Sequence, residues 1–157
     1  MHPPCSAPAG GWATGATSEP SGAPIAAYQR HFRADVTSVA MFHPGHGTWI
    51  VTIASASPAG TTAKLAGRYP RQLCVVRSRF RVAAVHAARA AAAALLTRSG
   101  HGRSKYGVTA VGVTARAAGQ PVVLVDAVSA AAALRAALAS QPAGLARIVP
   151  WLRPVSG

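Results

Sequence analysis

Residues 73–97, LCVVRSRFRVAAVHAARAAAAALLT, contain the sharpest change of pattern in the chain. The first part, Leu73 to Phe80, is short, contains Val75 and Val76 and ends in alternating arginines, which predicts a β-strand. The second part, Val82 to Thr97, is rich in alanine and places its larger apolar side chains along one arc, which predicts an amphipathic helix. A strand that leads directly into a helix therefore organises the middle of the chain.

The same kinds of segment continue toward the C-terminus. We expect two strands, a second alanine-rich helix and a last strand, at Tyr106 to Ala115, Val122 to Val125, Ala127 to Ser140 and Ala146 to Leu152, respectively. Asp126 or Ser129 is a suitable N-cap for the second helix. Pro150 lacks a backbone N–H and would confine the last strand to a sheet edge.

The resulting order, βαββαβ, predicts an α+β fold with a small antiparallel sheet and two alanine-rich helices, in a ferredoxin-like arrangement. An alternative interpretation is a degenerate repeat, because strand, strand and alanine-rich helix occur over residues 48–97 and again over 106–140. Both interpretations use the same elements and differ in sheet order. We favour the ferredoxin-like arrangement.

A β-hairpin is expected before this unit. Thr48 to Ile53 is rich in β-branched residues and predicts a strand, preceded by a Pro-Gly turn at 43–47. Ser57 to Gly60 predicts a hairpin turn, and Thr61 to Tyr69 a weaker return strand. The pattern between Ile25 and Met41 is ambiguous.

The N-terminal composition sets the expected domain boundary. Residues 1–24 consist mostly of Pro, Gly, Ala, Ser and Thr, which bury too little apolar surface to offset chain entropy. We therefore expect a disordered tail over 1–24 and a single α+β domain over 25–157.

The charge balance points to an anionic partner. The chain holds 16 Lys and Arg against three acidic residues, a formal net charge of +13 over 157 residues. Basic surfaces bind nucleic acid largely through the release of counterions from phosphates, so DNA or RNA is the expected partner. Two alternatives stay open: a coding bias, which explains arginine over lysine better than the scarcity of acids, and a reading frame that is not a selected protein.

Three arginines are the first candidate contacts. Arg77, Arg79 and Arg81 recur at every second position, so a continuous strand would project them from one face at intervals of roughly 6–7 Å. Each guanidinium can fork onto a pair of phosphate oxygens. The structural alternative is a solvated strand edge whose charges prevent edge-to-edge aggregation.

A basic loop after the first alanine-rich helix supplies the other candidates, Arg98, Arg103 and Lys105, with His101 among them. Its glycines resemble those of a phosphate-binding loop only in composition, because such a loop precedes a helix N-terminus and this one follows a helix. We expect backbone contacts without sequence specificity.

Catalysis, cofactors and metals find little support. Asp35 and Asp126 are the only carboxylates outside the expected tail, which leaves no pair for acid–base chemistry. His31, His43 and His46 lack nearby cysteines to complete a closed metal site. We expect no enzyme activity, no cofactor and no metal; a small enzyme that uses Cys74 with His86 or other histidines is the weakest alternative.

Location and assembly follow from the same composition. No run approaches the ~18 apolar residues of a membrane helix, and no signal peptide is evident, so we expect a cytoplasmic protein that does not enter a membrane. Cys5 in the tail and Cys74 in a strand are not expected to form a structural disulfide, which fits a reducing compartment. Charged residues are only 12% of the chain, so weakly polar surface also suggests a structural protein that forms homo-oligomers or joins a larger complex.

Overall fold

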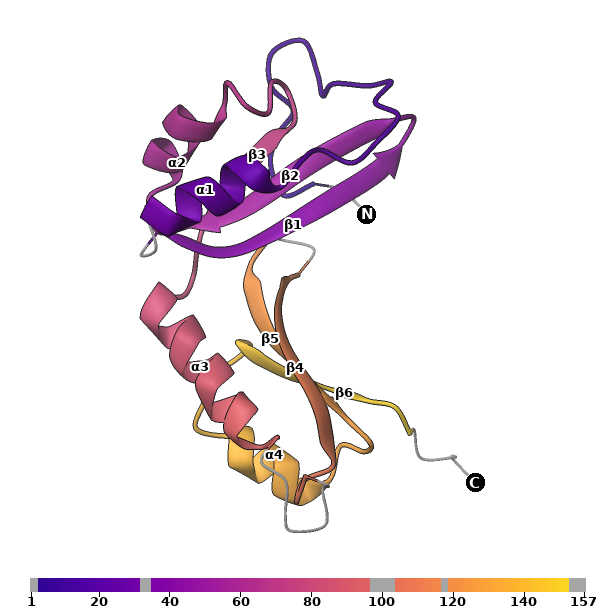
Figure 1. Ribbon diagram of the computed structural model, residues 1–157, viewed down its shortest axis with the longest axis vertical. Helices are drawn as coiled ribbons and strands as arrows, with labels where there is room; N and C mark the ends of the chain where they lie inside the picture. The colour runs from indigo at the N-terminus through magenta and orange to yellow at the C-terminus, as the bar shows by residue number, and fades with distance from the viewer. Residues whose placement is uncertain (1–2, 32–34, 97–103, 117–118, 153–157) are drawn as a thin grey trace. The chain divides into compact units, whose positions relative to one another are not determined.

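The computed structural model describes residues 3–31, 35–96, 104–116 and 119–152. Four helices and six strands are assigned within these ranges (Figure 1), and the strands form two sheets of three. The α+β class is confirmed. The expected single antiparallel sheet is wrong, because both sheets are mixed, and the ferredoxin-like arrangement is not confirmed.

The chain groups by its contacts into two compact units. Unit 1 comprises Met1–Val82 with Ala115–Pro121, and unit 2 comprises Ala83–Thr114 with Val122–Gly157. The expected boundaries, a disordered tail to residue 24 and one domain from residue 25, stay predictions.

Unit 1 contains two helices and the first sheet. Its elements are α1 (Ala23–His31), β1 (Val36–Gly45), β2 (Thr48–Ser55), α2 (Pro58–Leu65) and β3 (Leu73–Arg77). β1 and β2 are antiparallel, whereas β2 and β3 are parallel. Two parallel strands need a crossover connection, and α2 provides it.

The expected strand over Thr61 to Tyr69 is therefore wrong. The Pro-Ala-Gly segment after Ser57 begins a helix instead of a hairpin turn, with Pro58 in the first turn, where its missing N–H costs nothing. β2 pairs instead with β1, which forms in the region whose pattern was ambiguous.

Unit 2 contains the other sheet and two more helices. Its elements are α3 (Val82–Ala94), β4 (Val108–Ala115), β5 (Pro121–Ala127), α4 (Ala132–Leu138) and β6 (Ala146–Pro150). β5 and β6 are parallel, with α4 as the crossover, and β6 lies at a sheet edge as its proline requires. Neither Asp126 nor Ser129 is the N-cap, because β5 continues to Ala127 and α4 begins at Ala132, with Ala131 as the residue before it. The expected helix start at Ala127 is therefore wrong.

The two units share one order of elements. Each runs helix, strand, strand, helix, strand, with the second strand at the centre of the sheet. The expected repeat of strand, strand and alanine-rich helix is not found over residues 48–97, which form strand, helix, strand and helix; the observed repeat begins at α1 and at α3.

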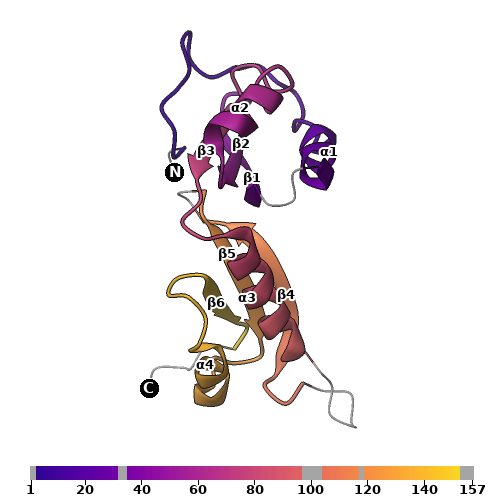
Figure 2. The ribbon, with the colours of Figure 1, turned by 90° about the vertical axis from the view of Figure 1, so that its left-hand side faces the viewer.

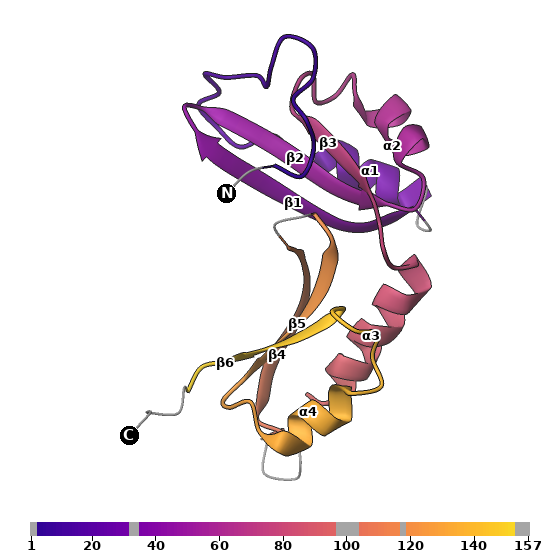
Figure 3. The same cartoon turned by 180° about the vertical axis from the view of Figure 1, so that it is seen from behind.

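The core of unit 1 lies between its sheet and its two helices. α1 and α2 cover one face of β1–β3 (Figures 1 and 3), and Ile25, Val51, Ile53, Leu65 and Tyr69 are buried there. In unit 2, α3 and α4 lie on the same side of β4–β6 (Figure 2). Val123, Val125 and Leu134 are fully buried in unit 2.

The N-terminal segment runs over the opposite face of the first sheet (Figure 3), where a disulfide joins Cys5 to Cys74 of β3. The expectation of no structural disulfide is wrong. Hydrogen bonds align the segment: Arg71 donates from Nε to the Gly11 carbonyl at 2.9 Å, and the Ala13 N–H donates to the Arg71 carbonyl at 2.9 Å. The argument for a reducing compartment is lost, and a cytoplasmic location stays a prediction.

Within the described ranges, no helix has the length and apolar character needed to cross a bilayer.

Candidate nucleic-acid interface

Arg77, Arg79 and Arg81 lie where the parallel strands β2 and β3 end. Arg77 is the last residue of β3 and pairs with Ser55, the last residue of β2. The expected continuous strand to Phe80 is therefore wrong, and the three guanidiniums do not share a regular strand face. The ladder closes with the Ser78 N–H donating to the Ser55 carbonyl at 2.9 Å.

A local turn ends the strand. The Ser78 hydroxyl donates to the Phe80 carbonyl at 2.8 Å and accepts from the Phe80 N–H at 3.2 Å. Thr37 of β1 donates its own hydroxyl to that of Ser78 at 2.8 Å. These bonds satisfy backbone groups that would otherwise continue a ladder, so the chain turns away from the sheet.

Gln120 holds the same segment from the turn between β4 and β5. Its side-chain oxygen accepts the Arg79 N–H at 2.8 Å, and its nitrogen donates to the Arg77 carbonyl at 2.9 Å. The backbone that carries Arg77 and Arg79 is therefore fixed at both residues while their side chains stay exposed. Sequence reasoning missed Gln120, since its only signal was its place beside Pro121 in a turn.

The electrostatic surroundings of the three arginines favour an anion. All three are exposed, and no ion pair joins them to an Asp or Glu among the described residues. The closest partner is the Ala56 carbonyl, 3.5 Å from Nη1 of Arg77. Helix α2 begins at Pro58, just after β2, so the positive end of its dipole lies near the end of β2 and also favours an anion. Ligands of open α/β sheets often bind at the carboxyl ends of parallel strands.

A buried hydroxyl cluster lies below this end of the sheet. Ser55 Oγ and Thr61 Oγ1 are 2.7 Å apart, Thr61 Oγ1 and the Tyr28 oxygen are 3.1 Å apart, and Tyr28 donates to Asp35 at 3.0 Å. Burial raises the pKa of Tyr28, and Asp35 raises it further, while the Thr61 bond lowers it. The cluster links α1, β2 and α2, and the Asp35 carboxylate accepts a hydrogen bond within it.

The second candidate group comprises Arg98, Arg103 and Lys105. Arg98 and Arg103 lie outside the described residues. Lys105 is exposed, with its Nζ 5.5 Å from the centroid of the Tyr106 ring. Lys105 belongs to unit 2, whereas the three arginines belong to unit 1.

The structure also describes several residues that were considered above for catalysis and metal binding. His43 packs against Trp49 with ring centroids 4.5 Å apart. Within the described part of the chain, no three His, Cys, Asp or Glu side chains gather as metal ligands. Cys74 is in the disulfide and has no free thiol, so a Cys74 nucleophile would first need reduction.

Comparison with known proteins adds no relative: no family model matches the chain, and no curated protein matches it.

Proposed function

We propose that this chain is a small, basic, nonenzymatic nucleic-acid-binding protein that contacts the phosphate backbone of DNA or RNA through Arg77, Arg79 and Arg81. The observation that supports the proposal is that three exposed arginines lie at and just after the carboxyl end of β3, with Gln120 holding the backbone at Arg77 and Arg79. Arg98, Arg103 and Lys105 belong to the proposal as further backbone contacts.

Counterion release supplies the driving force. A DNA duplex has condensed cations along its phosphates, and a guanidinium that binds a phosphate releases them into solution. The logarithm of the binding constant therefore falls linearly with the logarithm of the salt concentration, with a slope of about 0.9 for each phosphate contacted. The shortage of acidic residues helps, since little negative charge on the protein opposes the approach. Because Gln120 already holds this backbone in the free protein, less conformational entropy is lost when nucleic acid binds.

A charge-matched pair of variants tests the proposal. We expect Arg77→Ala/Arg79→Ala/Arg81→Ala to weaken binding to a labelled duplex by at least about tenfold near 0.1 M salt, and to lower the salt slope by about two to three. Fluorescence anisotropy measures both quantities, with a single-stranded RNA of equal length in parallel.

The control removes the same charge elsewhere. Lys64→Ala/Arg68→Ala/Arg89→Ala removes three exposed positive charges, two at and after the C-terminal end of α2 and one on α3 of unit 2. If the control variant weakens binding as much as the strand-end variant, the contacts are a general property of net charge and the proposed interface is refuted.

Assembly is a second candidate function, favoured by exposed apolar side chains of unit 2. Trp151 and Leu152, directly after β6, are 70% and 64% exposed. Apolar side chains of this size are often buried by a partner. Multi-angle light scattering would favour assembly if the protein is a discrete oligomer that Trp151→Ser/Leu152→Ser converts to a monomer, without any change in nucleic-acid binding.

A further inference from the structure

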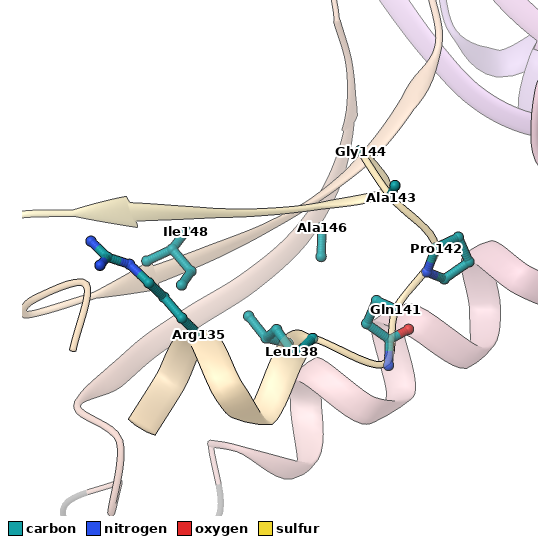
Figure 4. Close-up of a pocket in the computed structure, with 9 residues that line it drawn as sticks. Arg135, Leu138, Gln141, Pro142, Ala143, Gly144, Ala146 and Ile148 are labelled. Carbon is teal, nitrogen blue, oxygen red and sulfur yellow. The ribbon is translucent and has the colours of Figure 1, made fainter. Parts of the chain in front are cut away.

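A hollow in unit 2 lies between helix α4 and the edge strand β6. It has a volume of about 290 Å³, and its floor is apolar, with Leu138 from α4 and Ala146 and Ile148 from β6. Figure 4 shows Arg135 extending from α4 beside Ile148, and Gln141 near the other end. The hollow therefore runs along a strand, with a cation beside the strand's C-terminal part.

The outer edge of β6 has backbone groups directed away from the sheet. The Val123 N–H donates to the Leu145 carbonyl at 2.7 Å, and the Trp151 N–H donates to the Ala127 carbonyl at 2.9 Å. Because alternate residues of a strand face opposite edges, the odd-numbered positions face β5, and Ala146 and Ile148 direct their N–H and C=O groups outward. In the described residues no strand pairs with this edge.

The same alternation separates two arginines. Ala146 and Ile148 are in register with Val123 and Val125, which are fully buried, so their side chains point to the helix-covered face. Arg147 is exposed and points to the opposite face, away from the hollow. Arg135 is the cation that lines the hollow, and no acidic residue lines it.

We propose that this hollow binds an extended, acidic peptide segment of another protein, which adds as a strand to the free edge of β6 and places a carboxylate on Arg135. The outward backbone groups of Ala146 and Ile148 match those of an extended chain. The apolar floor accepts an alternate side chain, and the guanidinium can form a forked contact with a carboxylate. A second copy of this chain is a poor occupant of this site, since its sequence holds only three Asp and Glu residues to place on Arg135. The proposal does not depend on the phosphate contacts proposed for unit 1.

Hydrogen exchange distinguishes strand addition from simple charge attraction. The probe is the synthetic peptide acetyl-Val-Glu-Val-Glu-Val-Glu-amide, titrated into the full-length, oxidised, ¹⁵N-labelled protein. We expect the amides of Ala146 and Ile148 to exchange at least about tenfold more slowly when the peptide is bound, and those of Arg147 and Val149 to change little. Unchanged exchange at Ala146 and Ile148 in the saturated protein would overturn the proposal.

Paired variants and peptides test the contacts separately. Arg135→Ala is expected to weaken peptide binding by about tenfold or more, and Arg147→Ala, which removes equal charge from the other face, by less than about twofold. A peptide N-methylated at every residue has no residue N–H to donate from either edge and is expected not to bind. Equal effects of the two arginine variants, or undiminished binding of the methylated peptide, would refute the site.

Two further outcomes would assign the edge to a different partner. Protection of Ala146 and Ile148 that rises with protein concentration in the absence of peptide would show a second copy there. Protection of the same amides by a DNA duplex, with loss of bound peptide, would show a phosphate backbone. Either result overturns the proposed peptide site.

Discussion

Among the described residues, Thr52 has a buried side-chain hydroxyl without a hydrogen-bond partner. It lies at the centre of β2, is 3% exposed, and has its Cγ2 close to Gly119 of the turn before β5. Burial removes the hydrogen bonds of a hydroxyl to water, and without a protein partner this loss lowers the stability of the folded state. We predict that Thr52→Val, which keeps the shape of the side chain, increases the free energy of unfolding by about 1 kcal/mol. Urea denaturation of the two proteins measures this, and a clear loss of stability would show that the hydroxyl has a partner.

Tyr28 illustrates the opposite case, a buried hydroxyl used fully. Its oxygen bonds Asp35 and Thr61, and Tyr28→Phe should therefore lower the free energy of unfolding by about 1–2 kcal/mol. The buried Tyr69 hydroxyl, which donates to the Ser21 carbonyl at 2.6 Å, offers a matched variant, Tyr69→Phe. Urea denaturation near neutral pH measures both changes, and a neutral Tyr28→Phe would contradict the importance of the cluster.

The same two tyrosines predict an alkaline limit to stability. Burial raises the pKa of both Tyr28 and Tyr69 above the ordinary value near 10. A raised pKa in the folded state means that the neutral form stabilises the fold: this contribution is complete below pH 10 and is lost as the pH rises through the folded-state values. Unfolding free energies measured between about pH 8 and 11 should fall above about pH 10, and the fall should be smaller in Tyr28→Phe. An identical fall in that variant would exclude Tyr28 as its source.

At the scale of elements, the disulfide ties the N-terminal segment to β3 across 69 positions of sequence. Closing a loop of this length restricts the unfolded chain, which is worth about 4 kcal/mol in the chain-entropy account. We predict that Cys5→Ser lowers the free energy of unfolding by about 2–4 kcal/mol. In a reducing buffer the wild type and the variant should become equally stable; a difference that persists there would mean that the disulfide is not its cause.

The elements themselves were predictable to different degrees. Pattern alone located β2, α3, β4 and β6 within a few residues, because each has a strong β-branched or alanine-rich run. It failed at α2, where Pro58 and Gly60 resemble a turn and only tertiary pairing selects a crossover helix. It also extended β3 past Arg77, since alternation continues in sequence although Ser78 ends the strand with its own hydrogen bonds.

The candidate interface was predictable in its residue types and not in its geometry. The arginines stand out in sequence because acids are so few. Their position at the end of a parallel pair depends on the β2–β3 register, and their fixed backbone depends on Gln120, 41 positions beyond Arg79. The disulfide was missed for the same reason, because no local pattern indicates that residues 3–16 run beside the first sheet.

At the scale of the whole molecule, net charge and its distribution connect the fold to the proposed function. Unit 1 presents three arginines at a strand end, and unit 2 presents Arg135 beside an open strand edge. The ligands proposed for the two sites differ: a phosphate backbone for the first and an acidic peptide for the second. Their separation between units allows each to be disabled without the other.

The salt dependence of nucleic-acid binding by the wild-type protein tests the central claim most directly. Anisotropy titrations with a labelled duplex between about 50 and 300 mM salt should give a linear fall of log K against log salt, with a slope of at least about 3 in magnitude if the three strand-end arginines each contact a phosphate. The slope should shrink by about two to three in the Arg77→Ala/Arg79→Ala/Arg81→Ala variant. Absence of binding at the lowest salt, or a slope that the triple variant leaves unchanged, would contradict the account.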